Sequence, residues 1–483
     1  MIRMLHFRLS CPATVLLACC VLCASQVALA AGVADPFDTG ALHAAGPGDS
    51  LGGALKATCR ATAGNAPLTL AEVTDQALCN NPQTRLAWAN ARAQAAQVGI
   101  AESAYLPTLS ASASRSRNTS DSGTNITYNQ TTMALSAGYL LYDFGGRAAT
   151  LDNARQLMAA LGATQDATLQ SVFFAAIQAY FQWHASEAAV GAARESEYAS
   201  RESLKAAEAR YRIGTGTPAD RLQAQTAASQ ATLTRIQAEG NARTALGNLA
   251  NAMGLDAQDA PAVAPPVDAV PDAAFERNLG ELIAAAKRAR PDLIAAEAQV
   301  KAAQAGIDVA RATGMPSISL NAGNSYNNND LGLAGTTRGT SIGVALSIPL
   351  FSGFNTTYRV RGAEAQLEAR TAQREQLAKQ VSLDVWRSYY ALTTSIESVR
   401  ASADLVASAE ASEKVATGRY KAGVGGILDL LNAQSALASA RQQNIQALYN
   451  WRIAKAALAQ SMGQIGFDQV ESATTPSKKA IQP

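Results

Sequence analysis

The sequence predicts a mixed α/β membrane protein built from two internal repeats, in which pairs of β-strands alternate with long helices. Three observations predict this fold. One stretch of sequence recurs at a single offset, each copy contains a proline-free helical stretch (147–212 and 356–421), and alternating apolar residues precede each stretch. The 483-residue, Ala-rich chain has 6% aromatic and 16% charged residues, which favours long packed helices over compact enzyme lobes.

The repeat aligns residues 82–254 with residues 291–463 at one offset, 291 − 82 = 209, without a gap. The coinciding positions include Pro82 with Pro291, Pro107 with Pro316, Tyr142 with Phe351, Gly214 with Gly423, and Asp220 with Asp429. Composition bias does not place so many different residue types at one offset. The predicted domains are a signal peptide (1–30), an N-terminal extension (31–67), a first repeat (68–255), a linker or equatorial segment (256–278), a second repeat (279–463) and a flexible C-terminal tail (464–483).

The N-terminus has the pattern of an export signal. Arg3 and Arg8 precede an apolar run over 14–22, and residues 28–30 are small or apolar, as cleavage requires. A second interpretation makes 16–19 a lipoprotein box, which would leave apolar residues 20–30 on the mature protein. After residue 30 no apolar run reaches the roughly 18 residues of a membrane helix, so any membrane insertion must use strands.

The mature chain keeps two cysteines, Cys59 and Cys79, because the other four leave with the signal. An oxidising periplasm permits a disulfide between them. The alternative is two unpaired thiols, since a sequence does not show whether the Cα atoms come close enough to be bridged.

Alternating apolar residues predict two pairs of strands. They occupy every second position over 109–113 and 133–141 in the first repeat, and over 318–322 and 342–350 in the second. The alternation fits an outer-membrane barrel with one face on lipid and one on water, and it equally fits a soluble hairpin packed on a core. Aromatic residues at the strand ends, including Tyr142, Phe144, Phe351 and Phe354, favour the barrel because they would form an interfacial girdle.

Four strands cannot close a barrel, which needs about eight or more. Three copies would give a 12-stranded barrel, four strands from each protomer, and closure removes the exposed edges. Each proline-free stretch would form a helix about 100 Å long. Apolar residues from Val381 to Val406 keep to one face of the second helix. Without the strands and the signal, a coiled-coil rod would explain such helices equally well.

At the strand ends, LYDFGG (141–146) and LFSGF (350–354), and at the helix turns, RYRIGTGTPADRLQAQ and RYKAGVGGILDLLNAQ, the sequence resembles the TolC family of outer membrane factors. The resemblance covers residues 68–463. It implies a homotrimer without enzymatic activity, located in the outer membrane, whose 12-stranded β-barrel continues into a long periplasmic α-helical barrel.

By the same resemblance the protein is the passive exit duct of a tripartite export system. Its expected partners are a periplasmic adaptor (membrane fusion) protein, an inner-membrane ABC exporter or drug pump, and the exported cargo. The weak lipoprotein box favours the type I protein secretion branch, such as the outer-membrane component of a cyclolysin-like RTX toxin exporter. Small-molecule or multidrug efflux is the alternative, and a periplasmic structural rod is a third hypothesis.

The two helix turns are the candidate functional site. Gly214 and Gly423 stand where a helix would end in a left-handed residue, and 217–220 has the pattern of a capping box. The resemblance implies a pore entrance at these turns, formed by Asp220, Asp429, Tyr420 and Asn432. We expect the adaptor to dock on Gly214, Thr215, Gly216, Gly423, Val424 and Gly425.

Capping alone would also explain both aspartates. The chain departs from some family members at Gly425, where they have an Arg, and at Asn432, where they have a further Asp. A strongly locked closed state and a second acidic ring are therefore not expected to carry over.

Other classes of function find little support. The net charge of +2 and the lack of Lys/Arg clusters argue against nucleic-acid binding. Only His184 among the three histidines lies in the repeated core, and a lone His on a long helix is usually a packing or surface residue. No metal-ligand cluster, phosphate loop or nucleophile elbow occurs in the sequence, which predicts no catalytic residue, no metal and no cofactor.

Overall fold

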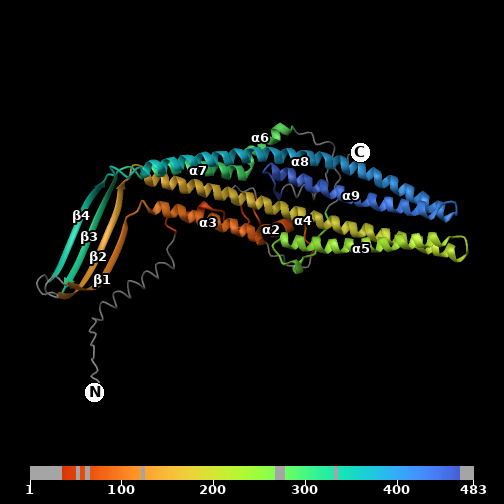
Figure 1. Cartoon of the computed structure of the whole chain (residues 1–483), viewed down its shortest axis with the longest axis horizontal. Helices are drawn as coiled ribbons and strands as arrows, with labels where there is room; N and C mark the ends of the chain where they lie inside the picture. The colour runs from red at the N-terminus through yellow and green to blue at the C-terminus, as the bar shows by residue number, and fades with distance from the viewer. Residues whose placement is uncertain are drawn as a thin grey trace, which may run out of the picture.

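The computed structural model describes residues 35–50, 55–59, 66–120, 126–266, 278–330 and 335–467. They form an elongated molecule with a four-stranded sheet at one end and two helix turns at the other (Figure 1). The predicted signal peptide and lipoprotein box lie outside the described residues, as do 267–277 of the linker and 468–483 of the tail.

Six helices and strands follow one another in each half of the chain. The first half contains α2 (Leu70–Asn80), α3 (Pro82–Ser103), β1 (Thr108–Ser120), β2 (Ile126–Tyr142), α4 (Gly146–Arg212) and α5 (Pro218–Ala252). The second contains α6 (Leu279–Ala289), α7 (Pro291–Ala312), β3 (Ser317–Asn329), β4 (Thr336–Ser347), α8 (Asn355–Lys421) and α9 (Ile427–Ser461). Short 3-10 turns, η1 (Thr39–Leu42) and η2 (Ala257–Asp259), lie outside this pattern. All bounds except those of β4 equal their first-half counterparts plus 209.

Two helices of 67 residues each, α4 and α8, run the length of the helical part, about 100 Å at 1.5 Å per residue. The shorter helices α3 and α7 lie beside them near the sheet, and α5 and α9 beside them near the turns (Figure 1). The predicted apolar stripe of α8 is confirmed: Val381, Val385, Leu392, Ile396 and Val399 are buried, and Val406 is half-buried.

The largest apolar cluster lies at mid-length, where α2 packs on α4 and on the end of α5. Its buried side chains include Val73, Phe173, Tyr180 and Met253. After α5, Gly254 has φ +74°, and a Cβ there would lie 2.7 Å from the Asn80 carbonyl. Two features of this position require glycine. The backbone is left-handed, and it lies too close to the junction of α2 and α3 to leave room for a Cβ atom.

The N-terminal segment is attached to this mid-length region by a covalent bond and by side-chain donors. Cys59 and Cys79 form a disulfide with their Cα atoms 5.6 Å apart. The indole of Trp88 donates to the Ala44 carbonyl over 2.9 Å, and the amide of Gln165 donates to the Asp49 carbonyl over 3.0 Å. These bonds join the segment to α2, α3 and α4.

The strands form one antiparallel sheet in the order β1-β2-β3-β4, so β2 and β3 join the two halves of the chain. The strand predicted to reach residue 350 ends instead at Ser347. Pro349 explains this correction, because proline has no N–H to donate to a neighbouring strand.

The register gives the sheet two different faces. Directly paired residues share a face, so one face carries the rows Leu109–Ala137–Ala322–Ile342 and Tyr139–Leu320–Val344. The opposite face carries serines, glycines and threonines, and Ser110 and Ser136 form a hydrogen bond across it. On the apolar face Ile342, Val344 and Leu346 are exposed.

Among the described residues, no helix is both long and apolar enough to cross a membrane.

His184 is the one histidine of the repeated core, and it is buried on α4 with 6% of its surface exposed. Its ring contacts those of Tyr180 and Trp183 edge to face, and its Nε2 has no hydrogen-bond partner. Burial lowers the pKa of His184 from 6.5 to about 4, against the opposing effect of the Ala264 carbonyl. The residue is therefore neutral in the folded protein at neutral pH.

This histidine predicts an acid-sensitive fold. Between pH 6.5 and 4 the unfolded chain takes up a proton that folded His184 does not, so the free energy of unfolding falls as the pH falls through this window. The loss is at most about 3 kcal/mol for one group. The variant His184→Phe should show a flatter dependence of the denaturation midpoint on pH between 7 and 4.5, measured by circular dichroism. Equal pH slopes in the wild type and this variant would contradict the assignment.

Candidate functional site

The turn between α4 and α5 is built from a helix end and a capping box. Gly214 has φ +78°, and the amides of Thr215 and Gly216 donate to the Arg210 carbonyl over 3.0 and 3.1 Å. Thr217 then caps α5: the Asp220 amide donates to the Thr217 hydroxyl, and the Thr217 amide donates to the Asp220 carboxylate, both over 3.1 Å. The Asp220 carboxylate is therefore held by the backbone of its own turn.

The turn between α8 and α9 has the same backbone path but a different cap. Gly423 has φ +79°, and the Val424 amide donates to the Arg419 carbonyl over 3.0 Å. Gly426 stands at the N-cap position and makes no side-chain capping bond. Asp429 lies in the first turn of α9 and is exposed. The Asp429 carboxylate is therefore available to ions or partners, whereas the Asp220 carboxylate already accepts a hydrogen bond from the Thr217 amide.

Two further glycines are needed for close packing within the turns. A Cβ on Gly216 would lie 3.0 Å from the Tyr211 amide nitrogen, and one on Gly425 would lie 3.0 Å from the Arg419 Cβ. The Arg that some TolC-like sequences have at the position of Gly425 would thus crowd the end of α8 in this chain.

Arg210 and Tyr420 join the two turns directly. The Arg210 guanidinium donates to the Tyr420 carbonyl and lies 4.2 Å from the centre of the Tyr420 ring. Ala207, Ala224, Ile427 and Leu430 pack around that ring. Burial raises the pKa of the Tyr420 phenol, with Arg210 opposing the shift. The ends of the two hairpins therefore form one packed unit, stabilised by a cation–π contact and a charged hydrogen bond.

The predicted entrance residues divide into buried and accessible groups. Asp429 and Asn432 are exposed and Asp220 is half-buried, whereas Tyr420 is only 4% exposed and packs between the hairpins. Every predicted docking residue lies on one of the two turns: Gly214, Thr215, Gly423 and Val424 are exposed, and Gly216 and Gly425 are half-buried.

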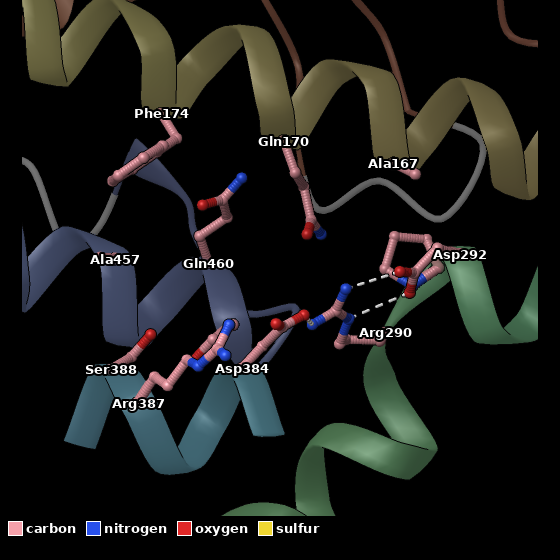
Figure 2. Close-up of a pocket in the computed structure, with 12 residues that line it drawn as sticks. Ala167, Gln170, Phe174, Arg290, Asp292, Asp384, Arg387, Ser388, Ala457 and Gln460 are labelled. Carbon is pink, nitrogen blue, oxygen red and sulfur yellow. Dashed lines mark hydrogen bonds and ion pairs between the residues drawn. The ribbon is translucent and has the colours of Figure 1, made fainter. Parts of the chain in front are cut away.

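A cavity at mid-length, whose lining includes charged side chains, was not indicated by the sequence. It has a volume of about 340 Å³ and lies between α4, α8, the end of α9 and the junction of α6 with α7 (Figure 2). The Arg290 guanidinium donates to both carboxylate oxygens of Asp292, over 3.0 and 2.6 Å, and to Asp384 of α8 over 2.9 Å. These bonds tie the α6–α7 junction to α8. The positions 209 residues earlier hold Asn81, Gln83 and Ala175, so the repeat gave no hint of the ion pairs.

Within the described ranges, no group of three or more His, Cys, Asp or Glu side chains is arranged to hold a metal ion.

The Arg210–Tyr420 contact predicts that the two turns are ordered together. In the variant Arg210→Ala, amide hydrogen exchange in residues 419–426 should rise about ten- to 150-fold, corresponding to a loss of about 1.5–3 kcal/mol for a charged hydrogen bond. The matched control is Arg212→Ala, an exposed arginine in the same last turn of α4. Equal exchange in both variants would mean that Arg210 does not join the turns.

Comparison with known proteins places this geometry in a family. The family model described as outer membrane efflux protein matches residues 73–255 and again 282–464. The protein CyaE of Bordetella pertussis is 33% identical over 408 residues, which cover 84% of this chain and 86% of CyaE. The outer membrane protein TolC of Vibrio cholerae is 26% identical, over 83% of this chain and 92% of TolC.

Solved structures agree with the sequence relatives. The open-state crystal structure of the MtrE outer membrane channel of Neisseria gonorrhoeae matches with a TM-score of 0.70 and 26% identity, covering 82% of this chain and 88% of MtrE. The names of these matches describe outer-membrane proteins and channels rather than enzymes. The chain therefore belongs to the outer membrane efflux protein family, the TolC-like channels of the outer membrane with a periplasmic helical extension.

Proposed function

We propose that three copies of this chain form the outer-membrane exit duct of a tripartite export system, used for type I protein secretion. One observation carries the proposal: a sheet with an apolar face has only four strands, and β1 and β4 each leave one edge unpaired among the described residues. Lipid cannot satisfy such edges. Three copies would pair every β4 with a neighbouring β1 and close a 12-stranded barrel.

The helices would continue this barrel as a tunnel. Equal element bounds at the offset of 209 support an internal duplication, in which each half supplies one long helix and one hairpin turn. Three protomers would then present six turns around one axis. Since the turns lie at the end of the molecule farthest from the sheet (Figure 1), they would form the periplasmic entrance.

At that entrance Asp220 and Asp429 from three protomers would supply six carboxylates, and rings of acidic side chains favour cations. Asp429 is the stronger candidate, because it is exposed and makes no capping bond. Asn432 lies nearly one turn further along α9, exposed and uncharged. The buried Tyr420 would support the entrance through Arg210 rather than line it.

The same turns would dock the periplasmic adaptor protein, which in turn would link the duct to an inner-membrane ABC exporter. Apolar side chains protrude from both turns: Ile213 is 74% exposed and Val424 is 69% exposed. Exposed apolar residues on otherwise polar turns are typical of surfaces that a partner covers.

Two cargo classes fit the duct. Protein secretion is supported by the greater identity to CyaE, 33%, and by the weak lipoprotein box. Small-molecule efflux is supported by the toluene efflux pump outer membrane protein TtgC of Pseudomonas putida, at 27% identity over 77% of this chain. Deletion of the gene distinguishes them: loss of a secreted protein supports the first, and sensitivity to solvents or antibiotics supports the second.

The trimer makes the first prediction of this proposal. In mild detergent the protein should have the mass of three mature chains by light scattering, because one chain lacks the strands to close a barrel. A stable monomer inserted in membranes would contradict the proposed assembly.

The acidic entrance makes the second prediction. In planar bilayers Asp429→Asn should lower the preference for cations, read from the reversal potential, and weaken block by multivalent cations. It should leave the melting temperature unchanged, because no capping bond is lost. The control is Asp259→Asn, which removes an exposed carboxylate at η2, far from the turns. An unchanged reversal potential in intact Asp429→Asn trimers would exclude this residue from the pore.

The docking turns make the third prediction. Cysteines placed at Thr215 and Val424 should crosslink to the adaptor in cells, whereas a cysteine at Gln442, exposed in the middle of α9, should not. Bulky residues at the same two positions should block export while trimer levels hold. If neither position crosslinks and export survives, the adaptor docks elsewhere on the tunnel.

A further inference from the structure

The charged residues of the sheet all lie on its apolar face. The four strands contain three charged residues, Arg115, Arg117 and Arg338, and no Lys, Asp or Glu. Arg115 and Arg117 stand an even number of positions from Leu109 on β1, so they share its face, and Arg338 shares the face of Ile342 on β4 for the same reason. The register pairs Leu109 with Ala137, Ala137 with Ala322, and Ala322 with Ile342. The polar face carries no charged residue, although charge would be favoured there if that face lined a water-filled lumen.

These arginines lie at the same end of the apolar rows, the end farthest from the helices, with Arg115 and Arg117 on one edge strand and Arg338 on the other. Arg338 pairs with Tyr326, which pairs with Met133 and through it with Ala113. Arg115 and Arg117 stand two and four positions beyond Ala113 on β1. From Leu346 to Arg338 the strand advances about 27 Å, which after tilting spans most of a barrel's roughly 25 Å apolar band. The arginines would therefore reach the headgroup layer of the outer leaflet.

The protein itself supplies little negative charge to them. Within the described ranges no carboxylate lies within ion-pair distance of any of the three, and all three are exposed. Arg338 instead lies over the Tyr326 ring, 5.8 Å from its centre. The nearby Asp330 is held by the amide and side chain of Asn129, which lower the pKa of its carboxyl, and the charge of Arg115 lowers that pKa further. Among the described residues at this end of the sheet, three arginines stand against one aspartate, an excess of two positive charges (3 − 1 = 2).

We propose that Arg115, Arg117 and Arg338 bind the phosphate groups of a phosphorylated glycolipid in the outer leaflet. A guanidinium binds phosphate through two parallel hydrogen bonds, and Arg115 and Arg117, two residues apart on one strand, lie about 7 Å from each other. In the proposed barrel, β4 of one protomer forms hydrogen bonds with β1 of the next. Arg338 would therefore lie near Arg115 and Arg117 of the neighbouring copy. The inference rests on the proposed trimeric barrel, and it adds a lipid that the barrel selects.

The test uses the purified full-length trimer in detergent and the triple variant R115S/R117S/R338S. The control variant R85S/R243S/R288S removes three exposed arginines from helices outside the sheet. Purified lipopolysaccharide should raise the melting temperature of wild-type and control trimers by several degrees, because a ligand that binds only the folded state stabilises it. The sheet variant should lose most of this rise, and dephosphorylated lipopolysaccharide should have no effect on any of them.

Other outcomes overturn the inference. An equal rise in the sheet variant would place the lipid elsewhere. An equal rise with phosphatidylglycerol would mean that any anionic lipid suffices. If the arginines only protect the open edges before assembly, the sheet variant would yield fewer trimers, and those formed would respond to lipopolysaccharide as the wild type does. Light scattering measures the mass of each sample and so tests the trimer separately. If the proposed barrel is wrong, neither the wild type nor any variant will have the mass of a trimer.

Discussion

An antiparallel sheet of four strands leaves two rows of backbone donors and acceptors without partners. Along β1 and β4 these rows are more than ten residues long, and one face of the sheet is apolar. A membrane does not offer water to such groups, so another strand must pair with them. The proposed trimer, its barrel and the ring of turns at its far end all depend on this one requirement. In the proposed assembly, one chain would supply a third of the channel.

Within one protomer the long helix α4 connects the parts. It packs against α2, α3, α5, α7 and α9. Its last turn carries Arg210, whose guanidinium contacts the carbonyl and the ring of Tyr420 at the end of α8. Arg441 of α9 also pairs with Glu195 of α4 and with Glu410 of α8. A displacement of one hairpin turn would therefore act on the other through these contacts.

The two halves differ most where their charges differ. At the turns, Thr217 caps α5 and engages Asp220, whereas Gly426 leaves Asp429 uncapped. At mid-length, the Arg290–Asp292–Asp384 cluster has no counterpart in the first half, where a disulfide fixes the N-terminal segment to α2 instead. The two halves thus share a backbone path but differ in their charged and capping side chains. A trimer would therefore have threefold rather than sixfold symmetry in these side chains.

The sequence by itself determined the repeat, the two pairs of strands, and the two long helices with their ends to within one residue, because prolines, capping residues and apolar periodicity act locally. Thr217 and Asp220 could be identified as a capping box for the same reason. Only the tertiary structure decided that Tyr420 is buried under Arg210, that Arg290 joins two segments, and that Arg338 of β4 lies on the same face of the sheet as Arg115 and Arg117 of β1. Each of these depends on a partner from a distant part of the chain, or on a register between strands, which no local pattern encodes.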